Sequence, residues 1–166
     1  MTDWRALFNL GEDFAHFRTH GLSDEIAAVD RVAAILSRPD SLSAKTRERI
    51  AQVNKPAYLL VCGEMWCPDC HRNITAFDAL CKLAPAIQMR IITHSRGERA
   101  LRPALWIERV AIPFAVILDE QFNPVGTFIE YPTSVVNGDD TVREHYKANG
   151  ELEAAINDIL DLVLAK

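Results

Sequence analysis

Residues 58–70 read YLLVCGEMWCPDC and join a short apolar run to two cysteines three positions apart. The run 58–62 is apolar throughout, which is typical of a central strand covered on both faces. Pro68 stands where a helix tolerates proline best, because the amides of a first helical turn have no partner within the helix. The stretch therefore predicts a buried strand that leads into a helix beginning at Pro68, directly after Cys67. A C-x-x-C pair near such a pattern indicates reversible disulfide chemistry.

The chain beyond this stretch predicts an α/β fold. We expect strands at 58–62, 87–92, 114–118 and 125–130, and helices at 68–83, 98–108, about 140–148 and from 152 onward. The last helix is strongly amphipathic. Helical crossovers imply a parallel strand pair, whereas the short connection 119–124 implies an antiparallel one. The result is a mixed sheet with helices on both faces.

The first third of the chain is expected to be helical. Apolar residues recur at helical spacing from Trp4 to Ala15, with Gly11 as a weak point. A second helix is expected after Ser23 as N-cap, and a third from Leu42 to Val53. We therefore divide the chain into an N-terminal helical extension, residues 1–54, and an α/β domain, residues 55–166.

Composition narrows the classes of partner. The 166 residues carry a net charge of −5, and no cluster of Lys and Arg predicts nucleic-acid binding. No apolar stretch approaches the length of a membrane span. The first residues show no secretory pattern, so we expect a reducing cytosol, where a C-x-x-C is catalytic or metal-binding rather than structural.

The two cysteines have different expected roles. The free N–H groups and the dipole of a helix start stabilise a thiolate at the first position, so Cys67 is the candidate nucleophile and Cys70 the resolving thiol. A protonated His71 would lower the pKa of Cys67, whereas Asp69 and Glu64 would raise it. Either carboxylate is also a candidate proton acceptor when Cys70 attacks. The cycle needs no cofactor.

The segment resembles the active site of the thioredoxin superfamily, in which a buried strand leads into Trp-Cys-x-x-Cys and a long helix. Ile112-Pro113-Phe114, just before a predicted strand, resembles the position of that superfamily's cis-proline. The resemblance implies a thioredoxin-like three-layer sandwich. It also implies a substrate groove at Trp66, Ile112 and Pro113, with the Ile112 backbone pairing with a bound peptide.

Two features of the sequence, at three positions, depart from thioredoxins proper. Val61 stands six positions before Cys67, where they usually carry a buried Asp, and Pro68-Asp69 replaces their Gly-Pro. We therefore expect a thiol–disulfide oxidoreductase that reduces protein or small-molecule disulfides in the cytosol. An external thiol or a reductase would supply the electrons, and recycling by a thioredoxin reductase is not implied.

Two other functions use the same residues. Cys62, Cys67, Cys70 and Cys81, with His71, would be the ligands of a zinc or iron–sulfur site, although metal sites usually gather their ligands from two short turns. Cys62 instead lies in a core strand, and Cys81 lies three turns along the helix from Cys70. A thioredoxin-like module that binds a partner without turnover is the other alternative.

Overall fold

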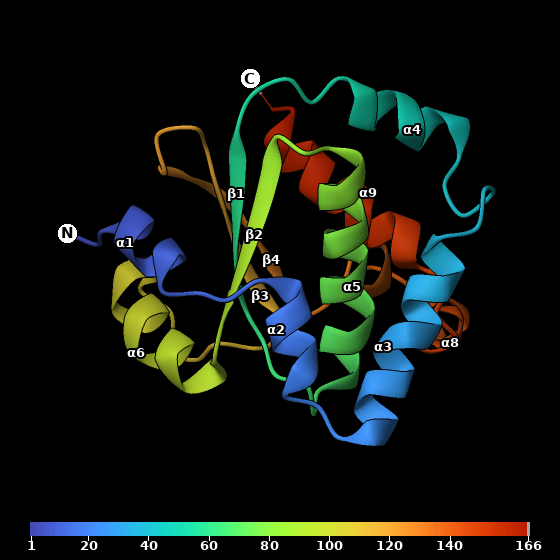
Figure 1. Ribbon diagram of the computed structural model, residues 1–166, viewed down its shortest axis with the longest axis horizontal. Helices are drawn as coiled ribbons and strands as arrows, with labels where there is room; N and C mark the ends of the chain where they lie inside the picture. The colour runs from blue at the N-terminus through green and yellow to red at the C-terminus, as the bar shows by residue number, and fades with distance from the viewer. Residues whose placement is uncertain (166) are drawn as a thin grey trace.

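A four-stranded mixed sheet forms the centre of the protein, with the strand order β2-β1-β3-β4 (Figure 1). The structure is a computed structural model that describes residues 1–165. The strands are β1 (Ala57–Cys62), β2 (Ile87–Ile92), β3 (Phe114–Leu118) and β4 (Pro124–Ile129). β1 pairs in parallel with β2 and antiparallel with β3, and β3 pairs antiparallel with β4. The predicted mixed α/β sheet is confirmed.

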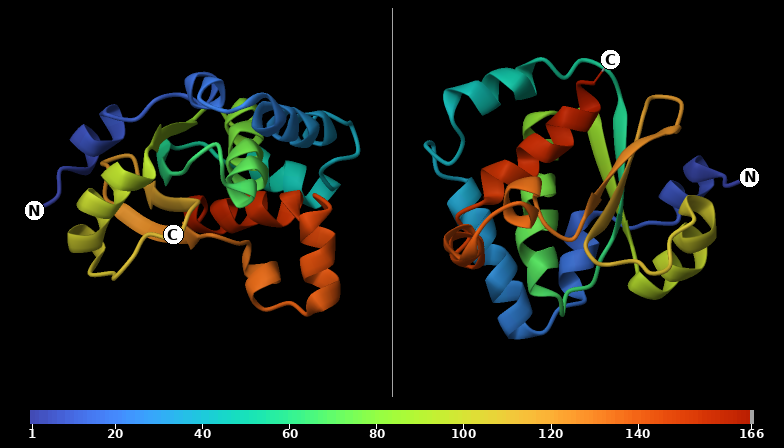
Figure 2. Two further views of the ribbon diagram at one scale, coloured as in Figure 1. Left: turned by 90° about the horizontal axis from the view of Figure 1, so that it is seen from below. Right: turned by 180° about the vertical axis from the view of Figure 1, so that it is seen from behind.

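Helices cover both faces of the sheet and make three layers. α5 (Pro68–Leu83) and α9 (Leu152–Val163) pack on one face, and α6 (His94–Leu105) and α1 (Trp4–Asn9) lie on the other (Figure 1; Figure 2). The central strands β1 and β3 are buried from both sides, which explains their continuous apolar sequence. This arrangement fixes the C-terminal end of β1, from which the chain turns into the C-x-x-C.

The N-terminal segment crosses an edge of the sheet. The helix predicted through Ala15 ends at Asn9, and α2 (Phe14–Thr19) begins with Asp13 as its N-cap. Between them, Glu12 and Ile91 exchange backbone hydrogen bonds of 2.9 and 2.8 Å, an antiparallel bridge to β2. The close approach depends on Gly11, because a Cβ there would lie 2.7 Å from the Cβ of Arg90.

The other helices differ from the prediction in three places: the N-cap of α3, the start of α6 and the additional helix α7. Leu22, not Ser23, is the N-cap of α3 (Ser23–Leu36), and its N–H donates to the Glu25 carboxylate at 2.7 Å. α6 begins four residues earlier than predicted, since the Thr93 hydroxyl caps it at the Arg96 N–H. The short helix α7 (Thr133–Val136) was not predicted. The remaining helices are α4 (Ala44–Ala51) and α8 (Asp140–Lys147).

Polar side chains fasten α4 to α9. The Thr46 hydroxyl donates to the Glu153 carboxylate at 2.6 Å, and Arg49 donates to Asn157 and Asp161, each at 2.6 Å. Within residues 1–165, no helix is long and apolar enough to cross a membrane.

Candidate active site

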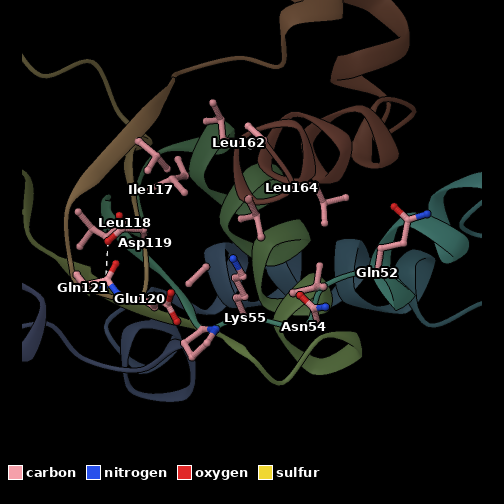
Figure 3. Close-up of a pocket in the computed structure, with 16 residues that line it drawn as sticks. Gln52, Asn54, Lys55, Ile117, Leu118, Asp119, Glu120, Gln121, Leu162 and Leu164 are labelled. Atoms are coloured by element: carbon pink, nitrogen blue, oxygen red, sulfur yellow. Dashed lines mark hydrogen bonds between the residues drawn. The ribbon is translucent and has the colours of Figure 1, made fainter.

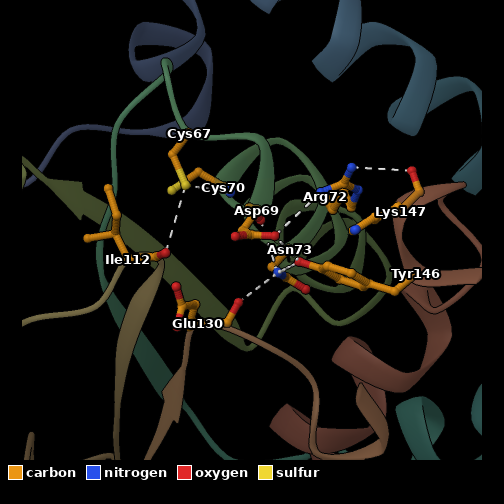
Figure 4. A network of polar contacts seen from close by, with 9 residues as sticks. All are labelled: Cys67, Asp69, Cys70, Arg72, Asn73, Ile112, Glu130, Tyr146 and Lys147. Atoms are coloured by element: carbon orange, nitrogen blue, oxygen red, sulfur yellow. Dashed lines mark hydrogen bonds and ion pairs between the residues drawn. The ribbon is translucent and has the colours of Figure 1, made fainter. Parts of the chain in front are cut away.

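Cys67 is the N-cap residue of α5, at the end of the loop that follows β1. Its extended backbone turns the side chain toward the first helical turn, where its sulfur accepts the N–H of Cys70 at 3.3 Å (Figure 4). The Cys67 thiol also lies 3.8 Å from the carbonyl oxygen of Ile112. Both cysteines are free thiols, and Cys70 lies beneath Cys67 in the core.

The two thiols differ in acidity for physical reasons. A hydrogen bond from the Cys70 thiol, helped by the backbone N–H groups of Cys70 and Asp69, lowers the pKa of Cys67 despite burial and the charge of Asp69. Burial, followed by the effect of Cys67, raises the pKa of Cys70 far above the ordinary value of 9.0. Cys67 is therefore the more acidic of the two thiols, as its position at a helix start predicts.

The residues predicted to form the groove surround Cys67. The Ile112–Pro113 peptide bond is cis, and both residues are buried beside the dithiol. The carbonyl of Pro113 accepts the N–H of Glu130 at 2.8 Å, which ties this loop to the end of β4. Trp66 directly precedes Cys67 and is 62% exposed. Trp66 thus presents an exposed apolar side chain next to Cys67.

Glu64 and His71 are directed away from the dithiol. The Glu64 carboxylate accepts the N–H of His94 at 2.8 Å, at the first residue of α6. The buried His71 donates from Nε2 to the carbonyl of Met65, which requires the tautomer with its hydrogen on Nε2. Their side chains therefore brace the segments around the site. The Glu64 backbone N–H does contact Cys70, where it lowers the thiol pKa against the larger effect of burial.

Asp69 belongs to a polar network that extends to α8 (Figure 4). Its Oδ1 accepts from the Tyr146 hydroxyl at 2.7 Å and lies 3.4 Å from Nη1 of Arg72. Asn73 donates from Nδ2 to the Tyr146 oxygen at 2.9 Å and to the Glu130 carbonyl at 3.2 Å.

Tyr146 and Asn73 were not predicted as site residues from the sequence. The signal for Asn73 was its place on the apolar face of α5, between Cys70 and Phe77, because a polar side chain that is 1% exposed needs partners. No local pattern connects Tyr146 to the C-x-x-C.

The other two cysteines, Cys62 and Cys81, are also free thiols. Cys62 donates to the Thr93 carbonyl at 3.4 Å, and burial raises its pKa to about 12. Burial likewise raises the pKa of Cys81 to about 12. Across residues 1–165, no group of three or more His, Cys, Asp or Glu side chains is arranged to hold a metal ion.

A cavity of about 770 Å³ lies at the opposite end of the sheet from Cys67 (Figure 3). Its lining comes from the segment before β1, the β3–β4 turn and the end of α9. Asp119, one of its acidic residues, accepts the N–H groups of Gln121 and Asn123, each at 2.9 Å, and so shapes the turn. The cavity does not contact the dithiol.

The fold and the dithiol at a helix start define a thioredoxin-like protein. A family model described as Thioredoxin matches residues 22–143, and the chain belongs to this family. A protein of unknown function from Pseudomonas aeruginosa, PA1234, is 42% identical, with a TM-score of 0.95 over 99% of this chain and 98% of that chain. The crystal structure of an HIV epitope scaffold is 41% identical, with a TM-score of 0.95 over 98% of both chains. A comparison with curated proteins gives no match.

Proposed function

We propose that the protein is a thiol–disulfide oxidoreductase that works through a Cys67/Cys70 dithiol–disulfide cycle. The observation that carries the proposal is the contrast between the two thiols at the start of α5. Cys67 receives hydrogen bonds that stabilise its thiolate, whereas the buried Cys70 stays protonated within reach of it. Exchange chemistry needs one acidic attacking thiol and a second thiol in reserve.

The proposed cycle balances in two steps. The Cys67 thiolate attacks one sulfur of a substrate disulfide, which breaks the S–S bond, forms a mixed disulfide and releases a substrate thiolate that takes up a proton. Cys70 then loses its proton and attacks the Cys67 sulfur, which releases the second substrate thiol. Two electrons pass from the protein to the substrate, and Cys67–Cys70 becomes a disulfide. An external thiol or a reductase returns two electrons.

The surface beside Cys67 supports a protein or small-molecule disulfide as substrate. Exposed Trp66 offers apolar contact, and the buried Ile112 and Pro113 border the sulfur. We propose Glu64 and His71 as residues that orient the loops, and Asp69 as the carboxylate that influences the dithiol. The proposed direction is reduction in a reducing cytosol, where the surrounding thiol pool favours it.

Trapping tests the proposal. Cys70→Ser in cells should accumulate proteins linked to Cys67 by mixed disulfides, because the second step is blocked. Cys81→Ser, a change of another thiol on the same helix, is the matched control and should trap nothing. The purified wild type should reduce insulin disulfides. In glutathione buffers its Cys67/Cys70 dithiol should come to a measurable equilibrium with the disulfide.

The proposal is wrong if no mixed disulfide forms and the wild type shows no such equilibrium. Partners that bind equally well to a Cys67→Ser/Cys70→Ser double variant would instead indicate a non-catalytic binding module. Stoichiometric zinc or iron in protein purified under reducing conditions would indicate the metal site.

A further inference from the structure

We infer that Tyr146, from α8, is a positioning residue for the dithiol, because its hydroxyl holds the Asp69 carboxylate against the first turn of α5. This inference rests on the proposed function and identifies a residue that influences the acidity of its two thiols. Asp69 is one of the two residues between the cysteines, whereas Tyr146 lies 77 positions further along the chain. The contact therefore joins the dithiol motif to a helix that contributes no cysteine.

Two contacts fix the carboxylate, and two more fix the Arg72 side chain that makes one of them. The Tyr146 hydroxyl lies 2.7 Å from Asp69 Oδ1, and Arg72 Nη1 approaches the same oxygen at 3.4 Å. The Arg72 guanidinium also lies 5.0 Å from the centre of the Tyr146 ring and donates to the Lys147 carbonyl at 3.2 Å. Both side chains of this ion pair are largely buried, at 22% exposed for Asp69 and 16% for Arg72. A carboxylate held in this way keeps a fixed place beside the thiols.

The hydrogen of the Tyr146 hydroxyl points to Asp69. Burial, with the charge of Asp69, raises the pKa of Tyr146, so the phenol remains protonated and donates. Asn73 donates to the Tyr146 oxygen, which leaves the carboxylate as the acceptor of the phenol hydrogen. The Tyr146 ring is also fixed, because it is 4% exposed and packs edge-on against Tyr131.

The held charge acts on both thiols. Asp69 raises the pKa of Cys67 and that of Cys70, in each case against or beside larger effects of hydrogen bonding and burial. Two other titratable groups lie near the thiols, Glu130 (Figure 4) and Tyr131, both just after β4, and the charge of Cys67 contributes to raising the pKa of Tyr131. The Glu64 carboxylate instead faces the start of α6. A carboxylate that disfavours the thiolate destabilises the reduced protein relative to the disulfide, which makes the dithiol a stronger reductant.

A double-mutant cycle tests the inference. Asp69→Asn should lower the Cys67 pKa and raise its thiolate fraction at a fixed pH below that pKa by about threefold to tenfold. Tyr146→Phe should change it in the same direction by a smaller factor, because the released carboxylate moves into water, where its field is weaker. In the Asp69→Asn background, Tyr146→Phe should have no further effect. Thiolate absorbance gives the fraction, and glutathione equilibrium should shift toward the dithiol in parallel.

Controls separate this inference from folding and from the proposed function. Tyr58→Phe removes a tyrosine hydroxyl at the other end of β1 and should change neither readout. If Tyr146→Phe fails to fold, Asp69→Glu keeps the charge but moves it off the Tyr146 hydroxyl, and it should also lower the Cys67 pKa. The inference is overturned if Cys67 in folded Tyr146→Phe titrates as it does in the wild type. It is also overturned if the effect of Tyr146→Phe on the Cys67 pKa adds fully to that of Asp69→Asn. If the wild type shows no dithiol–disulfide equilibrium in glutathione buffers, the proposed function is wrong. The titration of the Cys67 thiolate can still be measured in that case, so the two failures are distinguishable.

Discussion

The sulfur of Cys62, at the end of β1, packs against the Cα of Gly97 in α6, in the space that a Cβ on residue 97 would fill. Such a Cβ would also lie 3.2 Å from the Cβ of Cys62. Helix α6 therefore approaches the sheet as closely as it does because residue 97 has no side chain. Cys62 is the last residue of β1, the strand that leads into the dithiol loop.

Gly97→Ala should destabilise the protein by about 1–3 kcal/mol, as overpacking of a close contact does. The free energy of unfolding in urea measures the loss. Cys62→Ala makes room for the new methyl group, so the double variant should be more stable than the sum of the two single changes predicts. Full additivity in this cycle, or a stable single variant, would show that the helix can move aside.

Alkylation of the reduced protein should select Cys67 over the other three cysteines. Hydrogen bonds lower the pKa of Cys67, whereas burial raises the pKa of Cys62 and of Cys81 to about 12. The rate with iodoacetamide should therefore fall as pH drops through the Cys67 pKa, which lies below 9.0. Mass spectrometry after partial alkylation identifies the site, and equal labelling of Cys81 in the native state would contradict the prediction.

The same pKa values set the sign of a stability change at high pH. Cys62 and Cys81 have higher pKa values when folded than the ordinary 9.0, so they favour the folded state below pH 9. That contribution is lost as pH rises from 9 toward 12, because the unfolded thiols ionise first. Urea unfolding of reduced protein across this range should show falling stability. Cys62→Ala should reduce the fall, and an unchanged slope would contradict the assignment.

Trp66→Ala should slow exchange with protein disulfides by roughly threefold to tenfold, since exposed aromatic side chains often dominate contact with a partner. The side chain is 62% exposed, so the free energy of unfolding should change little. Exchange with a small disulfide such as oxidised glutathione measures the chemistry alone and should be nearly unaffected. An equal loss on both substrates would place Trp66 in the chemistry instead of in docking.

Glu153→Gln should weaken the attachment of α4 to α9 by about 1 kcal/mol. Burial raises the pKa of Glu153, but hydrogen bonds from Thr46 and Ser43 together lower it by more, so the net shift of the pKa is downward. The wild type should therefore lose this contribution as pH falls from the unfolded value of 4.5 through the folded pKa, and the variant should lack the dependence. Urea unfolding at neutral and acid pH gives both values.

The sequence was most informative where one local pattern determines the structure. β2 and the apolar run of β3 match the predicted 87–92 and 114–118, and α5 begins at Pro68 as the first-turn proline indicates. The α6 boundary was less predictable, because Pro103 falls inside the last turn and the cap at Thr93 precedes a polar first turn.

Long-range contacts account for what the sequence could not predict. The Glu12–Ile91 bridge depends on how close Gly11 approaches β2, and no local spacing encodes that distance. The Tyr146–Asp69 contact joins α8 to α5 in the same way. The thioredoxin family was predicted correctly from Trp66, the two cysteines and Pro113, whereas the roles of the site residues and the boundary at residue 54 stay predictions.

The backbone bridge between Glu12 and Ile91 makes the two edge strands of the sheet, β2 and β4, differ in how their outer sides are paired. The β2 margin is met by the N-terminal segment, whereas β4, within residues 1–165, has a strand partner on one side alone. A shortened protein beginning at α2 would lose Glu12 and leave backbone groups of β2 open to another chain. Unpaired strand margins are where aggregation begins. The first dozen residues, which include none of the cysteines, thus bear on whether the protein remains monodisperse when it is prepared.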